Sequence, residues 1–396
     1  MNGLPPPPQD RSSQGNPSAP PVDPIRFHQR LILEVPNEKA RLQVGGRLHY
    51  DFSLLSSGPS DAGVPRGPTE LRRLFATLSG NYGRFLAKAE WDFADGEADV
   101  VDLYAGFERI PLLGRLRFGK IKEPFGVERV TSDNNTLFVD RFLGASAFFP
   151  TRNLGAKLDN VAWAERLFWS LGIFRDASGF DVGRGPLNYS GRLSIVAWEK
   201  GERRMLQAGL SLSRRNPPFS EVRIQRRPNS RFGIQTLDSG LFPASSARFV
   251  SPQVSLLWDR LSVHGTWVRA AYQRLEPQAA SPSGAKDRVF ESGVIQLSYA
   301  LSSGFRPFDR RNAVFRRMRG FKALHKGGVG GWEIGARLAV LDLQDDDIRG
   351  GRVSNVTLGI NWYPTRFSRV MINYLRSDFD VAEREHRLLG RLQLSF

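Results

Sequence analysis

The stretch "WEIGARLAVLD" (residues 332–342) alternates between apolar side chains and small or charged ones. One face carries Trp332, Ile334, Ala336, Leu338 and Val340, and the other carries Glu333, Gly335, Arg337 and Ala339. A period of two residues is the signature of a β-strand with two different faces. "NVTLGINWY" (355–363) and "LLGRLQLSF" (388–396) repeat the pattern. From Arg41 onward, many such runs are separated by Gly, Pro, Asn and Asp, so the sequence predicts an antiparallel all-β protein.

The polar face of these runs decides between two all-β architectures. It is rich in glycine and in basic residues, which include Arg47, Arg73, Arg115, Arg117, Lys157, Arg192, Arg337 and Arg391. A soluble sandwich would bury the apolar face and expose the polar one, and short alternation by itself fits that arrangement too. A transmembrane barrel places the apolar face in lipid and the polar face around a wet lumen, and its closure satisfies every strand edge. The charged polar face and the final strand ending at Phe396 favour the barrel.

Composition restricts the partners. The chain has 396 residues, a formal net charge of +16 and no cysteine, which excludes disulfides and thiolate metal sites. The positive charge predicts an anionic partner: small anions, anionic lipid, an acidic polymer or nucleic acid.

No run approaches the roughly 20 apolar residues of a membrane helix, and no export signal is visible. Residues 1–40, rich in Pro and Ser, are predicted to be a disordered linker, and residues 41–396 the barrel domain.

One stretch, residues 119–150, interrupts the regular hairpins. It reads "GKIKEPFGVERVTSDNNTLFVDRFLGASAFFP" and is too long for a hairpin turn. Ser132 or Asp133 can cap a short helix that begins near Asn134. Apolar side chains can pack the segment onto a wall, namely Leu137, Phe138, Phe142 and Phe148. That packing leaves Arg129 and Arg141 to point into an opening.

Several motifs together resemble the phosphate-selective porins of the O/P family. The most specific are "KEPFGVERVTS" (122–132), "GGWEIGAR" (330–337) and "GINWYP" (359–364), and supporting stretches span nearly the whole chain after the linker. The resemblance implies an outer-membrane barrel of roughly 16 strands that assembles as a homotrimer. It also implies passive diffusion of phosphate and other small anions, and an inward fold of residues 119–150 that narrows the channel.

The resemblance also implies the residues of an anion site. "ELRRLF" places Arg72 and Arg73 at the family's arginine pair, "GVERVTS" places Arg129 and Ser132, and "FVDR" places Arg141. "VVDLY" places Asp102 where a lumen carboxylate is expected. Arginine suits this role because its planar fork donates charge-assisted hydrogen bonds to phosphate oxygens.

Two departures from the family pattern predict a weaker site. Phe75 stands where the family has a tyrosine, so one hydroxyl donor is lost. Asp133 follows Ser132 where a neutral donor is expected, and its charge opposes an anion. Strict alternation also cannot place both Arg72 and Arg73 in the lumen, so one of them must lie at a bulge or a strand end.

Other functions stay open at this level. The chain could be a general anion, polyphosphate or oxyanion porin without a tight phosphate site, or a β-rich surface protein that binds acidic polymers. A barrel enzyme such as a lipase would need a nucleophile motif, and no GxSxG is present. The five histidines show no paired metal spacing. We therefore expect no catalytic residues, metal or cofactor, with small anions and outer-membrane lipid rather than nucleic acid as partners.

Overall fold

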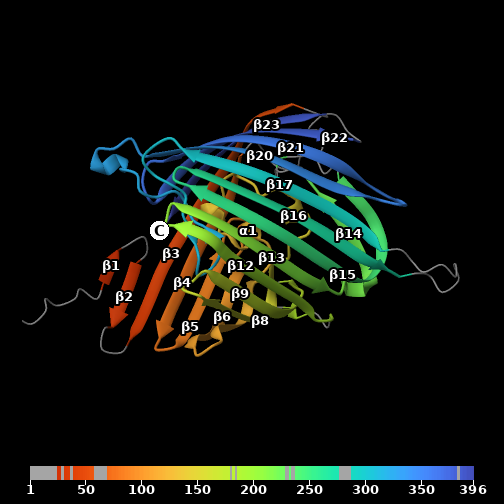
Figure 1. Cartoon of the computed structure of the whole chain (residues 1–396), viewed down its shortest axis with the longest axis horizontal. Helices are drawn as coiled ribbons and strands as arrows, with labels where there is room; N and C mark the ends of the chain where they lie inside the picture. Colours follow the sequence, from red (N-terminus) through yellow and green to blue (C-terminus); the bar gives the residue numbers. More distant parts are fainter. Residues whose placement is uncertain are drawn as a thin grey trace, which may run out of the picture.

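The strands form a closed barrel. The computed structural model describes residues 25–27, 31–35, 39–57, 69–178, 181–182, 185–227, 232, 237–275, 287–380 and 384–396. Sixteen antiparallel strands follow one another around the ring, and the last, β23, pairs with the first, β3 (Figure 1). They are β3 (Ala40–Ser57), β4 (Thr69–Tyr82), β5 (Phe85–Asp92), β6 (Asp99–Ile110), β7 (Gly114–Lys122), β8 (Arg152–Ala162), β9 (Leu167–Arg175), β12 (Asn188–Lys200), β13 (Arg204–Arg215), β15 (Leu237–Trp258), β16 (Leu261–Arg274), β17 (Arg288–Ala300), β20 (Gly331–Asp345), β21 (Ile348–Tyr363), β22 (Ser368–Phe379) and β23 (Glu385–Ser395). The predicted fold class is confirmed.

The two ends of the barrel differ. At one end the hairpin turns are short, and the chain also finishes there at Phe396, on the left of Figure 1. We call it the tight-turn end; its turns are residues 83–84, 111–113, 163–166, 201–203, 259–260 and 364–367. The opposite, loop end carries longer connections, including the small hairpin of β10 (Ala177–Ser178) and β11 (Asp181–Val182) and the strand β14 (Glu221–Arg226), which is preceded by η3 (Pro218–Ser220) and pairs with an extension of β15.

The chemistry of the barrel is inverted relative to a soluble protein. The outward side chain Leu338 is 57% exposed, whereas its lumen-facing neighbour Arg337 is 2% exposed. Aromatic pairs stack on the outer surface near the tight-turn end, Trp198 on Trp258 and Trp332 on Trp362. An apolar outer band bordered by aromatic residues is typical of barrels in lipid. We call this outward-facing band the apolar belt. Among the residues that the structure describes, no helix is both long and apolar enough to cross a bilayer.

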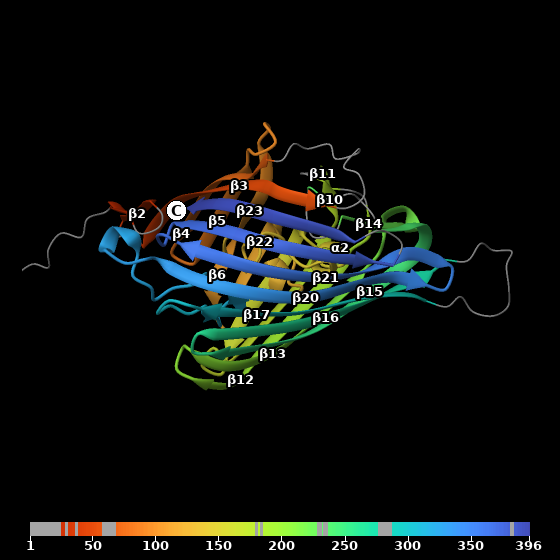
Figure 2. The same cartoon turned by 90° about the horizontal axis from the view of Figure 1, so that it is seen from above.

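The segment between β7 and β8 folds into the barrel from the loop end. This inward segment comprises residues 123–151 and contains α1 (Val127–Val130), η2 (Asp133–Asn135) and α2 (Leu143–Ala147). Figure 1 and Figure 2 show α1 and α2 within the ring of strands. The segment begins later than the predicted residue 119, because β7 continues through Lys122.

Polar side chains of the wall bind the backbone of the inward segment. Arg369 donates to the Thr136 carbonyl at 2.7 Å, and Asn361 donates to the Leu137 carbonyl at 2.9 Å. Farther along, the Val139 amide donates to Asn373 at 2.7 Å, and Arg337 donates to the Asp140 carbonyl at 2.8 Å. These bonds partner the buried backbone, which would otherwise lose its hydrogen bonds to water.

Apolar contacts hold the same segment, as predicted. Leu137 and Phe138 lie over Gly335 and Gly359, which face each other on β20 and β21. A methyl group at either glycine would come within 3.1 Å of these side chains, so the glycines leave the room that the segment occupies. Phe142 and Phe148 are fully buried in an aromatic cluster on the lumen side, whose other members include Phe125, Phe149, Phe249, Tyr272 and Phe290.

A second segment enters the lumen from the tight-turn end, and no sequence pattern predicted it. This second inward segment, residues 301–330, joins β17 to β20 and contains β18 (Phe308–Asp309), β19 (Val314–Phe315) and η4 (Leu324–Lys326). Its Arg306 forms a buried pair with Glu333, with both nitrogen–oxygen distances 2.9 Å, and donates to the Asn135 carbonyl of the first segment at 2.6 Å. Phe315 packs with Val127. The two segments therefore brace each other inside the barrel.

The predicted N-terminal linker is partly ordered. β1 (Ile25–Phe27) and β2 (Leu31–Val35) form a hairpin, and β2 pairs with the start of β3 beyond the end of β23. Residues 25–27 and 31–35, which lie within the predicted linker, thus form strands that extend the sheet. Residues 1–24 lie outside the described residues.

The brace between the segments gives a first prediction. Arg306→Met should lower the free energy of unfolding by about 3–5 kcal/mol, because it leaves Glu333 buried without its cation. It should also increase the noise of single-channel currents, because residue 135 loses its anchor. Thermal unfolding in detergent and planar-bilayer recordings measure both effects. Arg311→Met is the control, since Arg311 is 74% exposed and paired with a surface glutamate. Equal behaviour of the two variants would contradict the brace.

Candidate anion site in the lumen

Two cavities meet the inward segment from opposite sides. The one toward the loop end has a volume of about 360 Å3. Its lining residues are Arg73, Val100, Val101, Lys120, Lys122, Arg129, Asp133, Arg141, Thr151 and Arg152. The one toward the tight-turn end, about 880 Å3, is bounded by Ser132, Asn134, Arg47 and the second inward segment. Residues 131–135, with the wall residues Arg47 and Arg73, therefore separate the cavities, and we call this region the neck.

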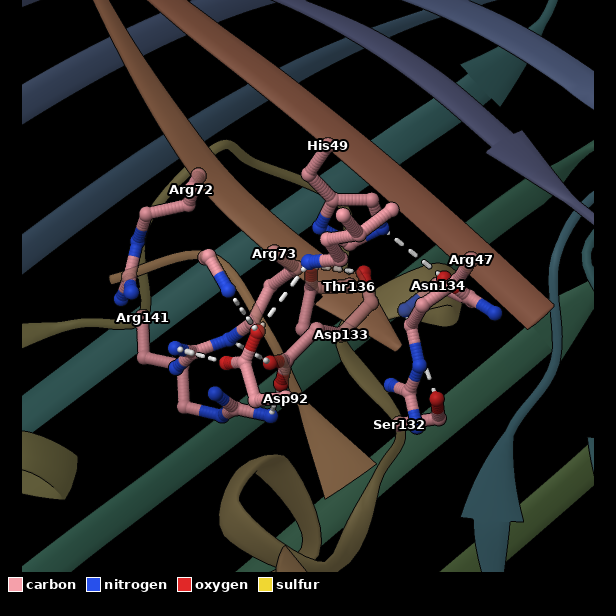
Figure 3. A network of polar contacts seen from close by, with 12 residues as sticks. Arg47, His49, Arg72, Arg73, Asp92, Ser132, Asp133, Asn134, Thr136 and Arg141 are labelled. Atoms are coloured by element: carbon pink, nitrogen blue, oxygen red, sulfur yellow. Dashed lines mark hydrogen bonds and ion pairs between the residues drawn. The ribbon is translucent and has the colours of Figure 1, made fainter. Parts of the chain in front are cut away.

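Arg73 lies in the neck between two carboxylates. Its Nη1 is 3.1 Å from Asp92 Oδ2, and its Nε is 3.7 Å from Asp133 Oδ2 (Figure 3). The guanidinium groups of Arg47 and Arg73 lie 4.1 and 5.6 Å from the centre of the Phe75 ring. A ring face attracts a cation. Phe75 thus holds two arginines by its ring, although it lacks the hydroxyl expected from the family pattern.

Arg72 reaches the lumen through a bulge. In the ladder between β3 and β4, Arg73 lies opposite His49 and Leu71 lies opposite Tyr50, so Arg72 is the extra residue. The prediction that one arginine of the pair sits at a bulge is confirmed. Arg72 Nε is 3.6 Å from Glu70 Oε1, so this guanidinium also has a nearby carboxylate.

Arg141 fastens the inward segment to itself. It donates to the carbonyls of Glu128 and Thr131, both at 2.9 Å, and forms an ion pair with Asp133. Burial alone would raise the pKa of Asp133, but Arg141, Lys122 and Arg73 outweigh it and hold that pKa well below its usual range. Asp133 is therefore a permanent counter-ion in the neck.

Ser132 and Arg129 have different local roles. The Ser132 hydroxyl accepts from the Asn134 amide at 3.4 Å and caps η2, as predicted, but the helix is a single 3-10 turn. Arg129 donates to the Ala145 carbonyl, and its Nε is buried without a hydrogen-bond partner among the residues that the structure describes. Burial and Arg141 lower the pKa of Arg129 to about 9, which still leaves it charged at neutral pH.

The Asp102 carboxylate, which was expected in the lumen, binds two cationic side chains. It accepts from Lys88 Nζ and from Arg152 Nε, each at 2.6 Å. Arg152 lines the smaller cavity and Lys88 the larger one. This carboxylate therefore positions cations on both sides of the neck.

Three cations of the smaller cavity were not predicted as site residues: Lys120, Lys122 and Arg152. Lys122 Nζ lies 3.3 and 3.4 Å from the carbonyl oxygens of Arg129 and Thr131. Arg152 pairs with Lys122 across the ladder of β7 and β8. Strict alternation points both side chains outward, and only the turn of the chain into the inward segment brings them to the cavity. Their positions at the two ends of that segment were the available signal.

The smaller cavity is suited to an anion. Its lining brings together six cationic side chains and one carboxylate: Arg73, Lys120, Lys122, Arg129, Arg141 and Arg152, with Asp133. Such donors can replace part of the hydration shell of an oxyanion. Within the described part of the chain, no cluster of three or more histidine or acidic side chains could hold a metal ion.

Comparison with known proteins agrees with this geometry. The sequence model of the family described as phosphate-selective porin O and P matches residues 42–396. The chain belongs to this family. It is thus an outer-membrane porin, a channel rather than an enzyme.

Individual relatives of this porin are distant. An uncharacterized protein of Caulobacter vibrioides is 25% identical over 381 residues, covering 89% of this chain and 73% of that protein. Among solved structures, the outer-membrane protein OmpT of Vibrio cholerae is 12% identical with a TM-score of 0.57, covering 92% of this chain and 100% of that one. An anion-selective porin from Comamonas acidovorans is 11% identical with a TM-score of 0.54, covering 90% and 100%. At these identities the structural likeness shows the fold.

The position of Asp102 gives a second prediction. Asp102→Asn should lower the free energy of unfolding of the porin by about 3 kcal/mol, since it leaves two partly buried cations without their shared carboxylate. The temperature at which the folded band is lost in detergent measures this effect. Asp95→Asn, in the exposed turn between β5 and β6, is the control and should change nothing. If the two variants melt alike, Asp102 does not hold the neck together.

Proposed function

We propose that this porin conducts small anions in preference to cations and binds phosphate or a phosphorylated solute in the smaller lumen cavity. The observation that carries the proposal is the excess of cations in that cavity, six against one carboxylate. An anion that enters loses part of its hydration, and the arginine and lysine donors compensate for the loss. Conduction requires that this binding stay moderate, because a tightly held ion blocks the path.

The side chains have unequal parts in the proposed site. Arg129 is the main donor, because its Nε has no partner among the described residues. Lys122 contributes an Nζ donor that contacts two backbone carbonyls and, among the described residues, no carboxylate at ion-pair distance. Arg73 adds a charge shared with Asp92 and Asp133. Arg141 chiefly positions the segment. Three further residues support the site. Arg72 adds a positive charge, Ser132 caps the short helix η2, and Asp102 holds Arg152 in position.

A general anion or oxyanion porin without a tight phosphate site is the second candidate. Asp133 favours it, because this carboxylate pairs with Arg141 and lies 3.7 Å from Arg73. An entering phosphate must therefore compete with the Asp133 carboxylate for the guanidinium groups of Arg73 and Arg141. We also propose that the porin is a homotrimer embedded in outer-membrane lipid; a trimer form of V. cholerae OmpT has been solved on the same fold.

Selectivity and block test the proposal directly. Reversal potentials in a KCl gradient should show anion preference, most clearly at low salt, where screening is weakest. Millimolar phosphate should reduce chloride current in the wild type. Arg129→Ala should weaken this block by about 1.5–3 kcal/mol, or roughly tenfold or more in half-blocking concentration. Arg141→Ala should weaken it too, by loosening the segment. Cation preference, or equal block in all three proteins, would contradict the proposed site.

Asp133→Asn separates the two candidate functions. The substitution keeps the shape of the side chain but releases Arg73 and Arg141 from their counter-ion, so phosphate block should strengthen by about tenfold or more. Glu97→Gln, in the exposed turn between β5 and β6, is the control for a change of one charge. Chloride conductance against phosphate concentration measures both. Unchanged block in Asp133→Asn would mean that Asp133 does not compete with the anion.

A further inference from the structure

The apolar belt ends in a row of arginines on three neighbouring strands. On the outer face, the exposed side chains Arg214 (β13), Arg248 (β15) and Arg269 (β16) follow apolar residues toward the loop end. Arg214 lies directly opposite Arg248 in the ladder. Arg269 lies opposite Val250, the next outward residue after Arg248. The three side chains therefore form one cluster, which we call the arginine row.

The arginine row has few counter-ions within the described part of the chain. Like charges directly opposite each other on two strands are destabilising. Among the described residues, no carboxylate lies within ion-pair distance of Arg214 or Arg248, and Arg269 has only Glu291, at 3.8 Å. Across the barrel, at the same edge of the belt, Arg376 pairs with Asp378 at 2.9 Å. Two arginines directly opposite each other without a nearby carboxylate would be stabilised by an external anion.

The surroundings indicate which anion. Barrels of this kind have short turns on the periplasmic side and longer loops outside, so the loop end faces the cell exterior. The edge of the belt at that end lies at the headgroup level of the outer leaflet, whose glycolipid carries phosphate or carboxylate groups. Exposed apolar side chains lie below the row, namely Leu212, Val250 and Trp267. Tyr189 lies opposite Arg214 and adds a hydroxyl.

We propose that Arg214, Arg248 and Arg269 bind the anionic headgroup of an outer-leaflet glycolipid, while its acyl chains lie along Leu212, Val250 and Trp267. Guanidinium groups donate forked hydrogen bonds to phosphate or carboxylate oxygens. A bound headgroup also removes the repulsion between Arg214 and Arg248. The site lies outside the pore, so it is independent of which ion the lumen selects.

Lipid titration tests the site. Purified porin in neutral detergent is mixed with lipopolysaccharide, phosphatidylcholine or inorganic phosphate, and bound lipid is measured by native mass spectrometry. Lipopolysaccharide should bind, and each Arg→Gln change in the row should weaken it about fivefold, the usual effect of one basic residue near an anionic lipid surface. Arg376→Gln is the matched control and should bind as the wild type does. Equal binding by the triple variant, or equal binding of phosphatidylcholine, would overturn the proposal.

Two further readouts separate this site from the lumen and from a purely structural role. Chloride conductance and its block by phosphate should be the same in the triple variant and the wild type; a change would place the arginines in the ion path and overturn the proposal. In lipid-free detergent, Arg248→Gln should melt at the same temperature as the wild type or higher, because repulsion is removed. When lipopolysaccharide is added, the melting temperature of the wild type should rise more than that of the variant. Equal destabilisation of the variant in both conditions would mean that Arg248 only packs against the protein.

Discussion

The structure depends on one constraint: polypeptide backbone inside a barrel must find hydrogen-bond partners on the barrel wall. The inward segment meets it through Arg369, Asn361, Asn373 and Arg337, which bind four backbone groups between residues 136 and 140. Because these side chains project from rigid strands, they fix the height and course of the segment. The arginines that the segment carries, Arg129 and Arg141, are placed by this arrangement. The polar lumen face is therefore first a scaffold for the segment and only then a surface for ions.

The same arginines both hold the structure together and set the electrostatic potential of the lumen. Their contacts within the protein leave fewer donors for an ion. Arg141 binds two carbonyls and a carboxylate, and Arg73 lies between Asp92 and Asp133. Each internal acid keeps a cation in position and lowers the field that an anion experiences. A narrow opening lined only with free guanidinium groups would repel itself. The porin resolves this conflict by leaving a minority of its cations, Arg129 and Lys122 among them, with neutral partners.

Period-two alternation predicted the strands and their faces, and the charged polar face with the final strand at Phe396 favoured the barrel over a sandwich. Alternation also required a bulge or a strand end at Arg72 or Arg73, and the structure has the bulge at Arg72. Alternation failed where strands end. The side chains of Lys122 and Arg152 turn inward where the chain leaves the strands, although strict alternation would point them outward. The second inward segment has no strand period, and its partners are far away in sequence, so only the three-dimensional structure shows it.

The contact between Arg306 and the Asn135 carbonyl joins residues 171 positions apart, from segments that enter the barrel at opposite ends. Neither segment can reach its final position until the strands that flank both have taken their places in the ring. The passage through the molecule is thus among the last features to form during assembly. A chain that has closed its wall but not yet joined its two segments is a wider and less discriminating hole than the finished protein. Contacts between residues so distant in sequence form slowly. The narrow passage is therefore a property of the whole barrel with both segments in place, and no single strand or segment forms it alone.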